Sequence, residues 1–172
     1  MLKNSLLIAL LALALSGCGY TMSRSSQESA PAAAGHKVYV PMFANDTFEP
    51  LVEADVTAAL KDELALDGRW TITDSADADL LVTGRVKTVD QQPLSYDKQE
   101  RILEYRVRLE VDVKVTDVRT QKVLWKDAAM ESSSAYRVTE DVTKGKISKG
   151  EAIKKASKGF AEEFVIKALD IF

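Results

Sequence analysis

Cys18 is the only cysteine of this 172-residue chain, and its position favours covalent acylation of the thiol. Lys3 makes the start of the chain positive, residues 6–15 form an uninterrupted apolar run, and two small residues precede the cysteine. This order is typical of a bacterial lipoprotein signal peptide. We therefore predict that residues 1–17 are removed and that Cys18 carries an S-diacylglycerol group and an N-acyl chain such as palmitate.

The apolar run is too short to cross a bilayer, because a transmembrane helix needs about 20 apolar residues. Two or more acyl chains hold a protein stably, since each buried methylene contributes roughly 0.8 kcal/mol. The processed chain is therefore expected to stay attached to a membrane. The alternative is an ordinary secretory signal followed by an incidental cysteine.

The remainder of the chain predicts a tether and one domain. Residues 18–35 form the lipidated N-terminus and a segment rich in Ser, Ala, Gln and Pro, which cannot repay the entropy of ordering. Residues 36–172 are long enough for a single domain with a real core. The formal net charge of −3 does not favour binding to nucleic acid.

Few residues of this chain could perform catalysis. His36 is the only histidine and stands where the tether meets the first predicted strand. The sequence has no glycine-rich phosphate loop, no histidine pair for zinc and no nucleophile elbow. We therefore predict no enzymatic activity, no catalytic residue, no metal and no cofactor apart from the covalent lipid on Cys18.

A group of basic side chains could instead bind an anion. Four of them lie on two predicted strands joined as an antiparallel hairpin by residues 88–103, and two more lie within that connection: Arg85, Lys87, Arg106 and Arg108 on the strands, and Lys98 and Arg101 in the connection. Such a hairpin would bring them together, and because facing like charges destabilise a sheet, the cluster favours a neutralising phosphate or carboxylate. Alternatively these cations pair with nearby acids, each exposed pair contributing about 0 to 1 kcal/mol; those acids are Asp90, Asp97, Glu100 and Glu104.

The elements that would carry these residues follow from the periodicity. Strict alternation of apolar and polar side chains in residues 105–116 predicts an antiparallel strand with one solvated face. Apolar residues at helical spacing predict two amphipathic helices, at 50–66 and 149–170, and polar residues 139–150 predict a mobile loop. The other predicted strands are 36–43, 80–89, 122–136 and the short segment 70–73.

This order of elements predicts an α+β domain. We expect a four-stranded, mainly antiparallel or mixed sheet with two helices packed on one face, and a polar opposite face.

Several stretches of the chain also resemble the LptE family of lipopolysaccharide-assembly lipoproteins. Together they cover nearly the whole mature chain: residues 18–20, 38–47, 78–84, 93–117 and 123–125. The resemblance implies a non-enzymatic subunit of the lipopolysaccharide transport machine. Such a subunit plugs the LptD β-barrel, assists its assembly and contacts lipopolysaccharide during insertion into the outer leaflet.

The resemblance also implies a location and ligand residues. Gly19 after the lipidated cysteine agrees with sorting to the outer membrane, where the domain would face the periplasm. Basic loop residues are implied to bind lipopolysaccharide, and their counterparts here are Lys98 together with Lys144 or Lys146. A polar sheet face suits the polar lumen of a barrel.

Part of the chain also resembles lipoproteins of a second functional class. Residues 43–47, followed by a helix and a strand, are similar to activator lipoproteins of peptidoglycan synthases and to curli-secretion lipoproteins. In that case the domain would be a regulatory binding module with no lipid substrate. The long alternating strand that leads into residues 123–125 favours the LptE-type interpretation.

Overall fold

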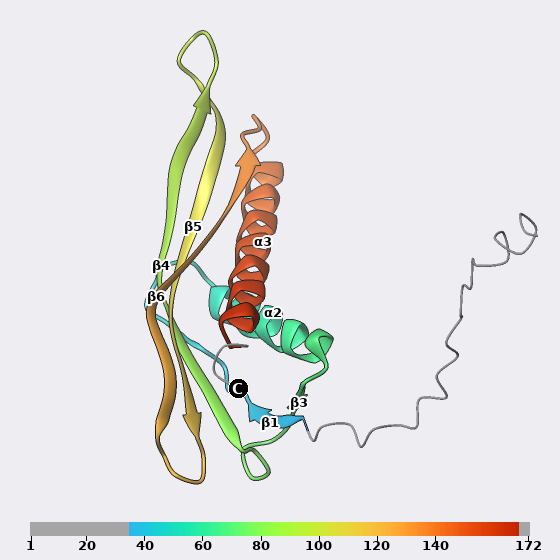
Figure 1. Ribbon diagram of the computed structural model, residues 1–172. Helices are drawn as coiled ribbons and strands as arrows, with labels where there is room; N and C mark the ends of the chain where they lie inside the picture. The colour runs from blue at the N-terminus through green and yellow to red at the C-terminus, as the bar shows by residue number, and fades with distance from the viewer. Residues whose placement is uncertain (1–34, 169–172) are drawn as a thin grey trace, which may run out of the picture. The chain divides into compact units, whose positions relative to one another are not determined.

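The computed structural model describes residues 35–168 (Figure 1). The signal peptide, Cys18 and nearly all of the predicted tether lie outside the described residues, as does the predicted end of the last helix. Within residues 35–168, no helix is both long enough and apolar enough to cross a membrane.

The described chain is an α+β fold, as predicted. Its elements, in chain order, are β1 (His36–Tyr39), β2 (Ala44–Asn45), α2 (Val52–Asp67), β3 (Trp70–Ile72), β4 (Leu80–Tyr96), β5 (Ile102–Asp117), β6 (Val123–Arg137) and α3 (Val142–Ala168).

The strands form one mixed sheet in the order β3-β1-β4-β5-β6, with β2 also paired to β4. The pairs that involve β1 and β2 are parallel, whereas β4–β5 and β5–β6 are antiparallel. The predicted count of four strands was wrong, because the sheet has six. The missed strand β2 has only two residues, too few to produce an alternating pattern.

The β4–β5 hairpin is longer than predicted. Its pairing continues from Leu80 opposite Asp117 to Tyr96 opposite Ile102, so only residues 97–101 form the turn. The predicted connection over 88–103 was therefore wrong. Residues 90–96 lack regular alternation because their part of the hairpin has no buried face to select apolar side chains.

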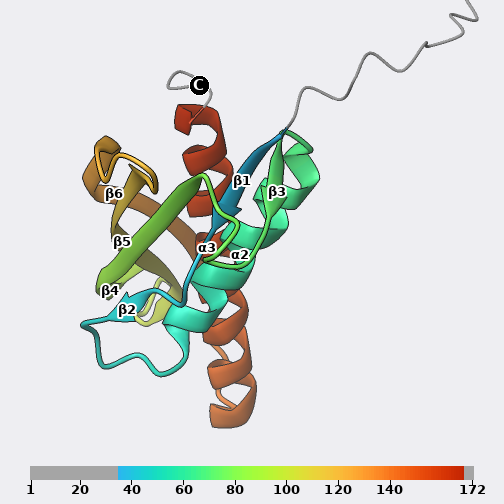
Figure 2. The same ribbon diagram turned by 90° about the horizontal axis from the view of Figure 1, so that it is seen from below.

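The core lies between the two helices and one face of the sheet, and Figures 1 and 2 show both helices on that side. Phe160 and Phe164 of α3 are fully buried there. The ring of Phe43 meets Phe160 edge-on, with 6.3 Å between the ring centres. Phe43 also lies directly over Gly84 of β4, where a Cβ atom would overlap the ring.

Helix α3 begins earlier than predicted, so residues 139–150 are mostly helical and not a mobile loop. The Asp141 side chain caps the helix, because its Oδ1 accepts hydrogen bonds from the backbone N–H groups of Thr143 at 2.9 Å and Lys144 at 3.1 Å. Such a cap contributes about 0.5 to 2 kcal/mol. This offsets the low helix propensity of Gly145 and Gly150.

Candidate functional site

The strand cations do not converge as predicted. Arg85 lies opposite Asp112, while Arg108 lies opposite Asp90 and Arg106 opposite Gln92. Asp112 and Arg106 are on the same strand, and a rise of about 3.4 Å per residue separates them by about 20 Å. The register therefore separates Arg85 from Arg106, so the four strand cations do not form one cluster.

Three of the cations have acidic partners, but only the partner of Arg101 is one of the acids that the local-pairing alternative named. Arg101 Nε lies 2.7 Å from Asp97 Oδ2 within the turn. Arg85 Nη1 lies 2.7 Å from Asp46 Oδ1. Arg108 Nη1 approaches Glu131 Oε1 at 3.4 Å.

The turn is organised around the Asp97 carboxylate. Its Oδ1 accepts hydrogen bonds from the backbone N–H groups of Gln99 at 2.8 Å and Arg101 at 2.9 Å. The backbone N–H of Arg101, followed by its side chain, holds the pKa of Asp97 below its ordinary value. The turn therefore has a fixed shape.

The end of the β4–β5 hairpin extends beyond the helices (Figure 1). It combines exposed apolar and basic side chains. We call it the hairpin tip, and define it as Leu94, Tyr96, Lys98, Arg101 and Leu103. Lys98 is exposed, and no ion pair between described residues involves it. This mixture matches a ligand that has both anionic groups and apolar chains.

Lys144 and Lys146 lie in the first turns of α3, at the same end of the sheet as the hairpin tip (Figure 1). A hydrogen bond of 2.9 Å from Val138 N to Leu103 O joins the segment before α3 to the hairpin. The fold therefore brings the basic residues of the hairpin tip and of the first turns of α3 to the same end of the sheet.

Beside Lys146 is an apolar recess that sequence reasoning missed. It has a volume of about 260 Å³ and is lined by Tyr105, Tyr136, Val138, Thr139, Val142, Gly145, Lys146 and Lys149. The two tyrosine rings stack with their centres 5.8 Å apart, and burial is the main cause that raises the pKa of Tyr136. In the alternating strand, Tyr105 lies on the same face as the buried apolar residues. This pattern was the sequence signal that could have placed Tyr105 on the core side.

No group of three or more potential metal-ligating side chains occurs between residues 35 and 168. His36 lies at the start of β1, where its ring is 5.8 Å from that of Trp70. The candidate site therefore consists of basic and apolar side chains suited to binding.

The fold is shared by solved bacterial proteins, two of which are described as lipoproteins. Rare lipoprotein B from Shewanella oneidensis superposes with a TM-score of 0.53 at 12% identity, covering 78% of this chain and 95% of that chain. A lipoprotein from Caulobacter crescentus superposes with a TM-score of 0.51 at 14% identity, covering 73% of this chain and 86% of that chain. The protein CT253 from Chlamydia trachomatis superposes with a TM-score of 0.57 at 12% identity, covering 79% of this chain and 97% of that chain.

The sequence profile of the lipopolysaccharide-assembly family, LptE, matches residues 36–167. The chain therefore belongs to the LptE family of lipoproteins, as its sequence resemblance implied. This is a family of envelope-associated, non-enzymatic lipoproteins that has no cofactor. Comparison with curated protein sequences gives no match.

Proposed function

We propose that this chain is an outer-membrane lipoprotein of the lipopolysaccharide transport machine, anchored through acyl groups on Cys18 and facing the periplasm. It plugs the LptD β-barrel, assists its assembly and contacts lipopolysaccharide during insertion into the outer leaflet. The observation that carries this proposal is the family match over residues 36–167, nearly all of the described chain.

The uncovered face of the sheet supports a place inside a barrel. Along β5 the side chains opposite the core are Arg106, Arg108, Glu110, Asp112 and Lys114. Barrel lumens are lined by polar residues. A face of this kind can therefore meet a lumen through hydrogen bonds and ion pairs without burying apolar surface.

The end of the molecule with the hairpin tip and the α3 start supports a contact with lipopolysaccharide. Lysine and arginine bind phosphate and carboxylate groups strongly. Tyr96 and Leu103, which are 57% and 47% exposed, place apolar surface beside Lys98 for contact with acyl chains.

The barrel partnership is tested by affinity purification of the full-length, tagged lipoprotein from envelopes in mild detergent. Recovery of a large outer-membrane barrel protein in stoichiometric amount is the expected result. Mass spectrometry of the processed chain tests the anchor, because it should find acyl chains on Cys18 of the wild type and none on a Cys18→Ala variant. Recovery of a peptidoglycan synthase or a curli-secretion channel in place of the barrel would overturn the proposal in favour of a regulatory lipoprotein.

Lipopolysaccharide contact is tested with the double variant Lys98→Glu and Lys144→Glu. Purified lipopolysaccharide should bind it about tenfold or more weakly, since each tenfold step needs only about 1.4 kcal/mol and two attractive charges are reversed. Lys122→Glu, which changes an exposed lysine at the β5–β6 turn, is the matched control. Arg106→Glu with Arg108→Glu tests the strand cations separately, and unchanged binding by either folded double variant would exclude the corresponding residues.

A further inference from the structure

The connection between β2 and α2 exposes two large apolar side chains. Phe48 is 107% exposed, and Leu51 is 69% exposed. We call these two residues the Phe48–Leu51 prong. Exposed apolar residues are common singly, but a large aromatic side chain on a loop of fixed shape can be buried by a partner with little loss of conformational freedom.

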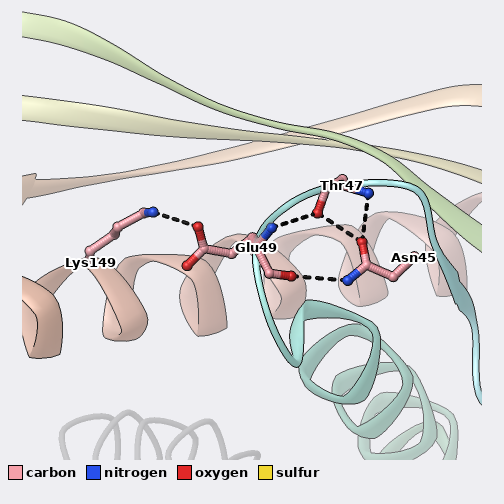
Figure 3. Close-up of polar contacts among 4 residues, drawn as sticks. All are labelled: Asn45, Thr47, Glu49 and Lys149. Atoms are coloured by element: carbon pink, nitrogen blue, oxygen red, sulfur yellow. Dashed lines mark hydrogen bonds and ion pairs between the residues drawn. The ribbon is translucent and has the colours of Figure 1, made fainter.

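The loop that carries the prong is held by the side chain of Asn45 (Figure 3). Its Oδ1 accepts hydrogen bonds from the backbone N–H and the hydroxyl of Thr47, both at 2.8 Å. Its Nδ2 donates to the backbone carbonyl of Glu49 at 2.9 Å and to Glu53 Oε2 at 2.8 Å. The residues on both sides of Phe48 are therefore fixed by one amide group.

Two ion pairs attach the same loop to the rest of the fold. Glu49 pairs with Lys149 of α3 (Figure 3), and both side chains are partly buried. Asp46 pairs with Arg85 of β4, and the backbone N–H of Asp46 donates to the carbonyl of Val86 at 3.0 Å. These contacts pair the charged side chains of the loop within the fold, whereas its two large apolar side chains stay exposed.

The backbone at the prong is also strained. Leu51 has a φ angle of 65°, a left-handed conformation that is unfavourable for a bulky residue without glycine's freedom. Its carbonyl nevertheless starts α2 by accepting hydrogen bonds from Ala54 N and Asp55 N. Strain of this kind persists where the surrounding structure enforces it and is frequent at binding sites.

A recess of about 320 Å³ lies next to the ring, between the loop and β4. It is lined by Asp46, Thr47, Phe48, Glu49, Lys87, Thr88 and Val89. Strand β2 pairs with β4 only at Arg85 and Val86, so the recess begins where that pairing ends. A partner that covers Phe48 can therefore also fill this recess, and a larger area becomes buried than the ring alone would give.

We propose that the Phe48–Leu51 prong docks into an apolar pocket of a protein partner, and that this partner is the barrel protein, so the inference rests on the proposed function. A lipid surface fits less well, because insertion of Phe48 would bring anionic headgroups against Asp46 and Glu49, where the headgroups would compete with these carboxylates for Arg85 and Lys149. A polypeptide pocket can receive the ring and leave these carboxylates paired at its rim.

Quantitative co-purification of the barrel with full-length variants tests the prong. Phe48→Ser should reduce recovery of the barrel about tenfold, as expected for an aromatic anchor, without lowering the melting temperature of the isolated lipoprotein. The matched control is Leu66→Ser, which removes a side chain of similar exposure, 77%, near the end of α2. Asn45→Ala keeps the ring but removes its support, and should cause a smaller loss.

The outcomes separate the two proposals. Failure of the wild-type chain to recover the barrel overturns the proposed function itself. If the wild type recovers the barrel and Phe48→Ser recovers it equally, the prong is not an anchor, although the barrel partnership stands. Binding of the unacylated wild-type chain, but not of Phe48→Ser, to vesicles of phosphatidylglycerol and phosphatidylethanolamine would identify a membrane occupant and also overturn the protein-pocket proposal.

Discussion

The two halves of the β4–β5 hairpin share the same strands but have different surroundings. In the half near the helices, Val82, Val86, Val111 and Val113 are at most 1% exposed. In the other half, Leu94 is 38% exposed and the remaining apolar side chains of the hairpin tip are more exposed still. A strand pattern therefore decides which side chains share a face, whereas the helices decide which of them are buried.

This difference indicates separate roles for the two halves. The covered half stabilises the domain, because burial of apolar area is the dominant favourable contribution to folding. The hairpin tip keeps apolar surface in solvent beside Lys98, as expected of the proposed ligand contact. The comparison predicts that substitutions in the covered half change stability, and that substitutions in the hairpin tip change binding.

The largest effect is expected from Phe160→Ala in the core beside the covered half. Phe160 is fully buried against Phe43 and Phe164, so its truncation should lower the free energy of unfolding by about 3 to 5 kcal/mol. Leu94→Ala at the tip should change it by less than about 0.5 kcal/mol. Urea denaturation of both variants measures the contrast, and comparable losses would contradict the division of roles.

A smaller loss is expected from Gly84→Ala in β4. The added methyl group overlaps the ring of Phe43, which is enclosed by the core and cannot move away freely. Overpacking of this kind should destabilise the domain by about 1 to 3 kcal/mol. Gly150→Ala is the matched control, because a Cβ there meets no atom within 4 Å and the residue is helical. Equal stability of Gly84→Ala and the wild type would argue against close contact between the Phe43 ring and β4.

The smallest effect concerns the ion pair between Asp127 of β6 and Lys167 of α3, whose Oδ2 and Nζ atoms are 3.0 Å apart. Lys167 lowers the pKa of the Asp127 carboxyl from its ordinary value of 3.8. The pair therefore stabilises the fold fully above that value, and the contribution is lost as the pH falls through the lowered folded-state pKa. Because both groups are partly solvated, the contribution is about 1 kcal/mol or less.

The measurement is the urea midpoint at neutral pH and near pH 3. Asp127→Asn should reduce the midpoint at neutral pH and should reduce it less in acid. Glu162→Gln, which changes an exposed ion pair on the surface of α3, is the control. A loss in Asp127→Asn that does not depend on pH would show that the carboxylate acts through hydrogen bonds, such as the one it accepts from Ala129 N, and not through its charge.

Much of the fold was predictable because it depends on local periodicity. Strand patterns identified the first part of β4, most of β5 and nearly all of β6, and helical spacing identified α2 and most of α3. The start of α3 was missed because Asp141 caps it from outside the periodic segment. Strand β2 was missed because its two residues form a strand only through pairing with Arg85 and Val86.

The candidate site was less predictable. The sequence identified the basic residues but could not place them, because the register of β4 against β5 separates Arg85 from Arg106 and gives Arg85 a partner in Asp46. The Phe48–Leu51 prong gave no periodic signal. Its exposure depends on hydrogen bonds and ion pairs that link Asn45, Glu49 and Lys149 across the fold.

The sequence by itself determined the α+β class, the family and the polar character of one sheet face, because each of these follows from residue order and local spacing. Only the tertiary structure decided which cations lie together, how far the hairpin extends beyond the helices and which apolar side chains stay in solvent. The physical reason is that these features arise from contacts between residues far apart in the chain, whose register and packing no local pattern encodes.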